Sequence, residues 1–182
     1  MLGILVAVIV LAPLVSGCSW LNGLGSQRLR TPQVMTITSP DFSTDVKIPL
    51  RYTCHGVGQS PPLYWSGAPQ AGETKSFAIV VDDSLAPITP YVYWIVFDIS
   101  PATTALAQNR LPPGARVAQN SRGLTGYDPP CPAGRNGHLY RFTVYALNAK
   151  LRLPAGAGLR KTWSAIALHV IGIGRLTALA KP

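Results

Sequence analysis

The sequence predicts a mainly β fold, in which antiparallel sheets pack together as a sandwich or a barrel-like pair. The chain of 182 residues contains 17 glycines and 17 prolines, and these residues separate several short apolar runs of strand length. Only one segment, late in the chain, has apolar residues at helical spacing. Many short strands joined by glycine and proline turns are typical of β-sandwiches rather than of alternating α/β folds.

The first 17 residues are expected to be a leader, a lipoprotein-type signal peptide outside the fold. Residues 1–17 have no charged side chain and are almost continuously apolar, but the run is shorter than the usual ~20 residues of a spanning helix. It ends in Ser16 and Gly17 before Cys18, a pattern that resembles a bacterial lipobox. Cys18 would then be the lipidated first residue of a mature protein anchored on the extracytoplasmic face of the cell membrane. No lysine or arginine follows Met1, so either the true translation start lies upstream of Met1 or the segment is an uncleaved anchor.

Residues 18–33 are expected to form a flexible tether, and residues 34–182 a single domain. The tether is rich in glycine, serine and asparagine, and the remaining chain has the length of one domain. The net charge is +9 with only 7 acidic residues, which favours anionic partners. The basic residues are dispersed, without the basic helix or aromatic platform of a nucleic-acid-binding protein. We therefore expect contact with anionic lipid headgroups and no nucleic-acid partner.

Strand patterns begin at the start of the domain. Residues 34–39 alternate apolar and polar side chains as a half-buried strand does. Short strands are expected at 46–49, 51–53 and 63–65. Residues 77–81 are five consecutive apolar residues, which predicts a central strand buried on both faces.

The second half of the domain contains the longest patterns. Residues 91–99 form the longest aromatic and β-branched run, which predicts a strand, and a long loop is expected over 101–130. Residues 139–147 alternate apolar and polar side chains, again as a strand does. A helix is predicted over 162–171, ending at a glycine, with a final strand at 174–180.

The cysteines predict one disulfide. If Cys18 carries lipid, Cys54 and Cys131 remain as an even pair in a compartment where disulfides persist. Closing a loop of about 78 residues would stabilise the fold by roughly 4 to 4.5 kcal/mol in the chain-entropy estimate. Two buried thiols are the alternative.

Five separated runs resemble, in order and spacing, the motifs of the phosphatidylethanolamine-binding proteins. The runs are IPLRYTCHGVGQSPPLYW, GETKSFAIVVDDSLAP, YWIVFDIS, QNSRGLTGYDPPCPAG and HLYRFTVYALNAKLRLPAG. They span the chain from about Ile37 to the C-terminus and are most similar to the bacterial Raf-kinase-inhibitor-like branch. The resemblance implies a β-sandwich with a small anion-binding pocket at one end.

The resemblance also implies which residues line that pocket. Asp83 matches the first aspartate of the family's aspartate-proline-aspartate-alanine-proline turn, whose end matches Pro87, although Ser84 and Leu85 replace its middle residues. His138 matches a pocket histidine. The remaining ligand-binding candidates are Tyr140, which matches a family tyrosine, the loop residues Pro130 and Gly134, and Tyr93.

Tyr93 is the largest departure from the family pattern. The family usually has a second pocket histidine at this position, just before an aromatic residue. A phenol keeps one hydrogen-bond donor but stays neutral near pH 7, since tyrosine titrates around 10. His138 would therefore carry most of any anion recognition.

The residue types support binding more than catalysis. A protonated imidazole oriented by a carboxylate can hold an anion, and the backbone N–H groups of a glycine loop can form an anion-binding nest. A purely structural histidine is the alternative for His138. The sequence contains no Gly-x-Ser-x-Gly or His-Glu-x-x-His motif and no paired metal-ligand spacing. We therefore expect no catalytic residue, no metal and no cofactor, and a site formed by Asp83, His138 and His55 has no spacing signal.

These observations predict a membrane-anchored binding module for a small anionic or phosphorylated ligand, such as a phospholipid headgroup. The alternative is an interaction or inhibitor protein acting on a protease or other envelope partner, with the loop 109–122 as its contact surface. We also predict the positions of two further polar residues. His169 is expected to pack in the core on the inner face of the helix, and Asp82 to be a turn residue.

Overall fold

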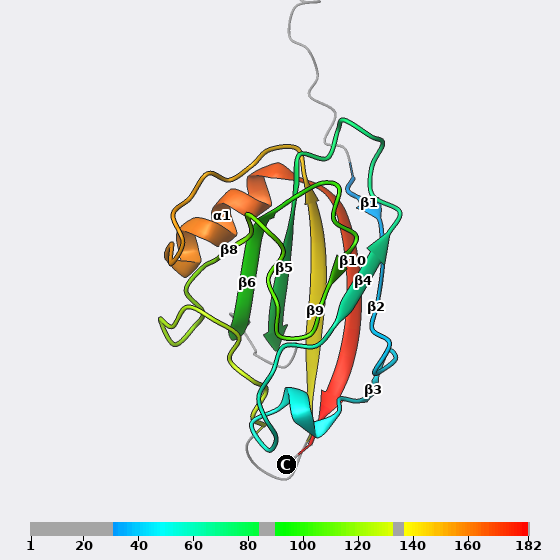
Figure 1. Ribbon diagram of the computed structural model, residues 1–182, viewed down its shortest axis with the longest axis vertical. Coiled ribbons are helices and arrows are strands. Elements are labelled where there is room, and N and C mark those ends of the chain that lie inside the picture. The colour runs from blue at the N-terminus through cyan, green and yellow to red at the C-terminus, as the bar shows by residue number, and fades with distance from the viewer. Residues whose placement is uncertain (1–30, 84–89, 133–136, 182) are drawn as a thin grey trace, which may run out of the picture.

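The computed structural model describes residues 31–83, 90–132 and 137–181, which form a β-sandwich with one α-helix (Figure 1). The strands are β1 (Gln33–Val34), β2 (Thr36–Thr38), β3 (Val46–Lys47), β4 (Leu63–Ser66), β5 (Ser76–Asp83), β6 (Val92–Ile99), β7 (Ala105–Leu106), β8 (Arg116–Val117), β9 (His138–Leu147) and β10 (Val170–Ala180). Helix α1 is Leu159–His169, and a 3-10 helix spans Leu50–Tyr52. The mainly β fold class predicted from the sequence is confirmed.

Two open sheets make up the sandwich. The larger sheet has the strand order β1-β10-β9-β5-β6-β8, with β3 also paired to β10, and the smaller sheet has the order β2-β4-β7. The four long strands of the larger sheet are antiparallel to one another. The short strands β1 and β3 pair with β10 in parallel, and all other strand pairs are antiparallel, as the mainly antiparallel prediction requires.

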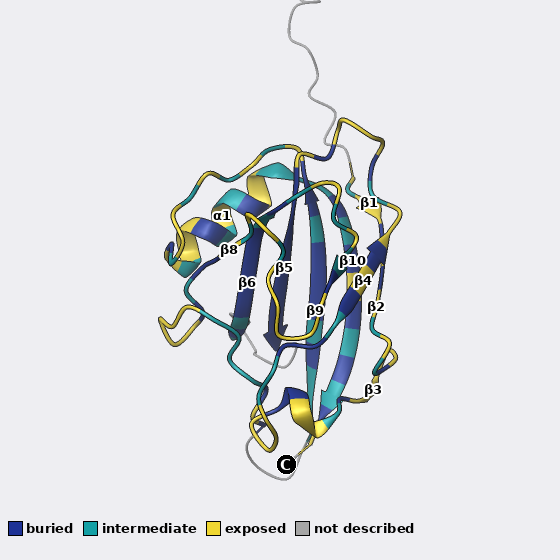
Figure 2. Cartoon of the chain, viewed as in Figure 1, coloured by how far each residue is buried: buried dark blue, intermediate teal, exposed yellow. Residues whose placement is uncertain are grey.

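Apolar clusters cover both faces of the larger sheet. One cluster lies between the two sheets and contains Trp65 and Phe142. The other includes Phe97 and, from α1, Ile166. Strand β5 lies between these clusters, and all eight of its residues are buried (Figure 2). This confirms that residues 77–81 form a central strand, as their continuous apolar sequence predicts.

The structure corrects several predicted boundaries. Residues 51–53 do not form a strand, because the N–H groups of Tyr52 and Thr53 donate to the carbonyls of Pro49 and Leu50 and close a 3-10 turn. The expected long loop 101–130 contains the two-residue strands β7 and β8. Helix α1 begins three residues earlier than predicted, at Leu159, and ends at His169. Strand β10 begins at the next residue, Val170.

The glycine expected to end the helix, Gly172, lies inside β10. A Cβ atom at Gly172 would come within 3.0 Å of Met35 Sδ, and one at Gly174 within 2.8 Å of the Met35 carbonyl oxygen. These glycines therefore allow the N-terminal segment to lie close against β10. They do not stop the helix.

Strand β6 has an irregularity at each end. Val81 is opposite Trp94, but the next residue, Asp82, is opposite Val92, so Tyr93 is an extra residue on β6. At the other end, Phe77 is opposite Ile99 and Ile79 is opposite Val96, which again leaves one extra residue on β6. Such bulges redirect side chains relative to strict alternation.

The predicted leader, Cys18 and most of the tether lie outside the described residues. Within the three described ranges, no helix is both long and apolar enough to cross a membrane.

Candidate functional site

Asp83 and His138 form a close pair at one end of the larger sheet. Asp83 is the last residue of β5, and His138 is the first residue of the neighbouring strand β9. His138 Nδ1 lies 2.7 Å from Asp83 Oδ2. The Asp83 side chain is 8% exposed and the His138 side chain 32%. Because the carboxylate occupies Nδ1, Nε2 is the imidazole nitrogen left to meet a ligand.

Tyr140 lies beside this pair on the same face of β9. Its ring is fully buried and lies 6.3 Å from the His138 ring in a stacked arrangement. Burial raises the pKa of Tyr140, and the nearby Tyr93 hydroxyl adds to this effect, so the phenol remains a donor. The Tyr93 hydroxyl is close enough to the Tyr140 hydroxyl to affect its pKa, but no described residue meets the Tyr140 hydroxyl with full hydrogen-bond geometry. A buried hydroxyl without a partner needs a ligand or water to satisfy it.

The bulge in β6 brings Tyr93 to this site. Tyr93 and Trp94 both contribute to the cluster between the sheets, whereas Val92 belongs to the cluster that includes α1. The Tyr93 ring packs edge-on against Tyr140 with 5.2 Å between ring centroids. The extra residue in the strand therefore places Tyr93 where regular alternation would have turned it away.

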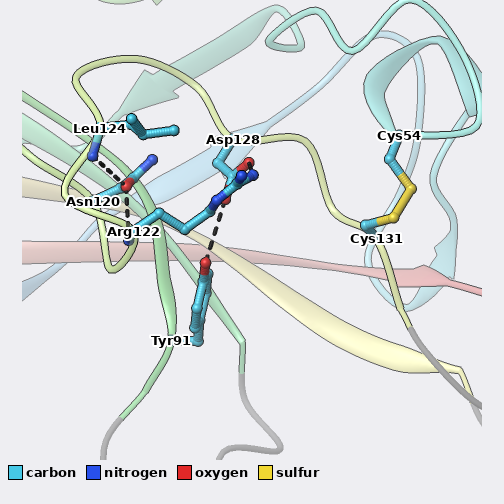
Figure 3. Close-up of polar contacts among 7 residues, drawn as sticks. All are labelled: Cys54, Tyr91, Asn120, Arg122, Leu124, Asp128 and Cys131. Atoms are coloured by element: carbon cyan, nitrogen blue, oxygen red, sulfur yellow. Dashed lines mark hydrogen bonds and ion pairs between the residues drawn. A yellow bond between two sulfur atoms is a disulfide. The ribbon is translucent and has the colours of Figure 1, made fainter.

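Tyr91, Asp128 and Arg122 extend the site, and the sequence analysis missed them. The Tyr91 ring lies 4.7 Å from the Tyr93 ring. The Tyr91 hydroxyl lies 3.5 Å from Asp128 Oδ2, and Arg122 Nη1 lies 3.1 Å from Asp128 Oδ1 (Figure 3). The Asn120 side-chain carbonyl accepts backbone N–H groups in the turn that carries Arg122. Arg122 and Asp128 lie within the quoted run QNSRGLTGYDPPCPAG, but their contact with Tyr91 joins two loops that are far apart in the sequence, so the run alone did not single them out.

The loop before His138 is held by the predicted disulfide. Cys54 and Cys131 are bonded, with an S–S distance of 2.04 Å, so the prediction of one bridge is confirmed (Figure 3). Pro130 is buried, and its carbonyl accepts the Cys54 N–H at 3.1 Å. This is a structural role. The ligand-binding candidates Pro87 and Gly134 lie outside the described residues.

His55 lies next to the disulfide. Its ring nitrogen is within 4.8 Å of the sulfurs of Cys54 and Cys131, and this is the one group of metal-ligand types found in the described part of the chain. Because the two sulfurs are bonded to each other, they are not the thiolates that a metal site requires.

Two expectations about polar residues are wrong. Asp82 is not in a turn: it lies within β5, is 5% exposed, and forms a two-point pair with Arg141 at 2.8 and 2.5 Å. His169 is not in the core. It ends α1 with partial exposure, and its Nδ1 lies 2.9 Å from Asn148 Oδ1, because the helix ends earlier than its apolar spacing suggested.

Comparison with known proteins identifies the family. The sequence profile of the phosphatidylethanolamine-binding proteins matches residues 38–181. The chain belongs to the phosphatidylethanolamine-binding protein family. A related protein of Methanothermobacter thermautotrophicus, described only as a UPF0098 protein, is 39% identical over 150 residues, which cover 80% of this chain and 97% of that one.

A second relative of this chain has a name that describes it as a lipoprotein. A candidate lipoprotein of Mycobacterium tuberculosis, LppC, is 42% identical over 143 residues, covering 78% of this chain and 70% of its own.

Solved structures of the family have the same fold. The homologue CT736 from Chlamydia trachomatis has a TM-score of 0.73 at 34% identity, covering 82% of this chain and 99% of its own. YBCL from Escherichia coli has a TM-score of 0.75 at 28% identity, covering 81% of this chain and 98% of its own.

Proposed function

We propose that this family member is a membrane-anchored binding module whose Asp83–His138 site takes a small anionic or phosphorylated ligand, such as a phospholipid headgroup. The observation that carries the proposal is the 2.7 Å contact between the imidazole and a buried carboxylate, beside the buried hydroxyl of Tyr140. Together they offer a ligand one potential cation and one neutral donor.

Binding would rest on charge-assisted hydrogen bonds from the imidazole. When His138 is protonated, Nε2 donates to an anionic oxygen while Asp83 holds the ring through Nδ1, and hydrogen bonds between charged groups are stronger than neutral ones. The Tyr140 and Tyr93 hydroxyls are neutral donors on the same face of the sheet.

Binding is favoured over catalysis by the state of the cysteine that precedes the site. Cys131 is bonded to Cys54, so it provides no thiolate nucleophile. A role as an inhibitor through the loop 109–122 is less well supported. Residues 116–117 of that loop form β8, and Val117, Ala118 and Asn120 are buried.

Anchoring through Cys18 is supported by the sequence pattern of residues 1–18 and by the name of the relative LppC. In this arrangement residues 1–17 are removed, residues 18–33 form the tether and residues 34–182 form the binding domain. Labelling cells with a palmitate analogue should mark the protein, and Cys18→Ser should abolish the label. A label that persists in the variant would contradict this assignment.

The binding site is tested by NMR of the His138 imidazole in the full chain. Adding phosphoethanolamine or inorganic phosphate should shift the imidazole signals, and Asp83→Asn should weaken binding by about tenfold because the ring loses its charged partner. Asp45→Asn is a matched control, since Asp45 is exposed and lies outside the site. Unchanged His138 signals at about 10 mM ligand would contradict the proposal, because such weak binding is below the usual range of specific sites.

A further inference from the structure

A cavity lies at the end of the larger sheet opposite to the Asp83–His138 pair. Ile99, the last residue of β6, is opposite Phe77, and Phe77 is opposite Ala146 of β9. Phe77 precedes Asp83 by six residues along β5, which corresponds to about 20 Å of strand. The two ends of the sheet are therefore separate places on the molecule.

This cavity has a volume of about 350 Å³ and is basic. Its walls include the cationic side chains of Arg116, Lys150 and Arg152, together with Ser100 and Asp98. Three cations and one carboxylate give a formal charge of +2. The positive field inside a concave site raises the local concentration of anions.

The charged groups of the cavity differ in what they already contact. Asp98 Oδ1 accepts the Leu151 N–H at 2.7 Å, and Arg116 Nη1 donates to the Leu153 carbonyl at 2.5 Å. For Lys150 and Arg152, the described chain provides no ion-pair partner. These two cations are therefore the groups available to an incoming anion.

The backbone around the cavity adopts conformations that are uncommon for residues other than glycine. Asp98 has φ 55° and Arg152 has φ 52°, and both lie in the left-handed region. Asp98 belongs to the irregular end of β6, as Tyr93 does at the other end. Unusual backbone conformations that the surrounding structure maintains are concentrated at binding sites.

An apolar cavity adjoins the basic one. It has a volume of about 520 Å³, and Lys150 lines both cavities. Its walls include Pro69, Phe77 and Pro101. Thr74 also lines it, is 7% exposed, and has a buried Oγ1 without a hydrogen-bond partner among the described residues. A buried hydroxyl of this kind is usually satisfied by a bound molecule or by water.

We propose that these adjoining cavities form a second binding site, which takes an anionic amphiphile. Its phosphate or carboxylate group lies between Lys150 and Arg152, and its apolar body lies along Phe77 and Pro101, with a polar atom reaching Thr74 Oγ1. This site is independent of the Asp83–His138 pair, because the two share no residue.

The site is tested by amide NMR of the full chain in a neutral detergent. Short-chain phosphatidic acid should shift the amide signals of Ser100, Leu151 and Arg152, whereas phosphatidylcholine of the same chain length should not. Inorganic phosphate should shift the same signals with about tenfold lower affinity, because it lacks the apolar body. Equal affinity for phosphate and phosphatidic acid would overturn the amphiphile assignment and leave a site for free anions.

Charge-matched double variants separate this site from general surface charge. Lys150→Gln/Arg152→Gln should weaken phosphatidic acid binding by about tenfold or more, since each change removes a charged hydrogen-bond donor. Arg160→Gln/Lys161→Gln removes the same charge from exposed positions on α1 and should change binding by less than about twofold. Equal losses in both variants, or no shift at the lining amides, would overturn the proposal. The His138 signals report the first site separately in the same spectra.

Discussion

Tyr93 contributes a neutral phenol beside the Asp83–His138 pair. Burial raises the pKa of this phenol, so it stays protonated and can donate a hydrogen bond. A phenol carries no positive charge in either protonation state. In the phosphatidylethanolamine-binding protein family this position usually carries a histidine. The Tyr93 ring packs between the rings of Tyr91 and Tyr140. An imidazole at position 93 would therefore lie near the ligand proposed for the Asp83–His138 pair.

We expect Tyr93→His to strengthen binding of inorganic phosphate by about tenfold at pH 6, because a second imidazolium adds a charge-assisted hydrogen bond. The gain should disappear near pH 8, where imidazole is neutral. Titration calorimetry at both pH values measures the effect, and Tyr93→Phe is the control for loss of the phenol alone. A gain that is the same at both pH values would show that charge is not its cause.

Asp41 should make stability depend on pH in the acid range. A hydrogen bond from the Tyr52 hydroxyl lowers the pKa of Asp41, and Arg51, 2.9 Å away, adds to this effect. A folded-state pKa below the unfolded value means that the stabilisation is complete above the ordinary aspartate pKa of about 3.9. It is lost as the pH falls through the lower folded-state value.

The Asp41→Asn variant should therefore lose about 1 kcal/mol of unfolding free energy at pH 7, the usual effect of one hydrogen bond. The difference from the wild type should shrink as the pH falls below the ordinary aspartate pKa of about 3.9. Urea denaturation at several pH values measures it, and Tyr52→Phe should reduce the same pH dependence. A deficit that stays constant down to pH 3 would contradict the assignment to the Asp41 carboxylate.

The sequence could identify only part of the site. Asp83, His138 and Tyr140 follow from motif resemblance, and the structure brings these three together. Asp128 and Arg122 lie in a run that resembles the family, but their contact with Tyr91 depends on how two distant loops fold together. No local pattern records that arrangement.

At the scale of elements, the ion pair between Asp82 and Arg141 joins the neighbouring strands β5 and β9. Both residues are largely buried, with side-chain exposures of 7% and 22%, and the carboxylate raises the pKa of Arg141 through a direct hydrogen bond. The pair points to the face of the sheet away from Asp83, since successive residues of a strand face opposite sides. Its effect should therefore be on stability and not on ligand binding.

Arg141→Leu should lower the free energy of unfolding by about 3 kcal/mol, because it leaves the Asp82 carboxylate buried without a partner. The double variant Asp82→Asn/Arg141→Gln should recover a substantial part of that loss, since no charge remains buried. Chemical denaturation measures both, with the His138 response to phosphate as the control for an intact site. A double variant as unstable as Arg141→Leu would contradict this explanation.

The sequence correctly predicted strands that have a long apolar pattern. It did not predict two very short strands, which form only by pairing with a neighbouring strand. The strands at 77–81, 91–99 and 139–147 were predicted from continuous or alternating apolar residues, and the structure confirms them. The two-residue strands β7 and β8 carry no periodicity, since they exist only through pairing with β4 and β6. The early start of β10 depends on contact between its glycines and Met35, which the sequence of β10 alone does not reveal.

At the scale of the whole molecule, the two candidate sites occupy opposite ends of one sheet. Strand β1, where the described chain begins, is joined through Gly172 and Ala146 to Phe77, so it lies at the end that carries the basic cavity (Figure 1). If the chain is anchored through Cys18, this end is the one nearer the membrane. Anionic lipids would then lie within reach of Lys150 and Arg152.

The Cys54–Cys131 disulfide covalently links two loops at the end of the molecule that carries the Asp83–His138 pair. It joins the turn after the 3-10 helix to the loop that leads into His138, with a sequence separation of 77 residues. Cys54→Ser/Cys131→Ser should lower the free energy of unfolding by roughly 3 to 4 kcal/mol, because the unfolded chain regains the entropy of a long closed loop. Denaturation of both proteins without reductant measures the change. Adding reductant should lower the free energy of unfolding of the wild type only. Equal unfolding midpoints would mean that the Pro130–Cys54 hydrogen bond and local packing suffice to hold this end.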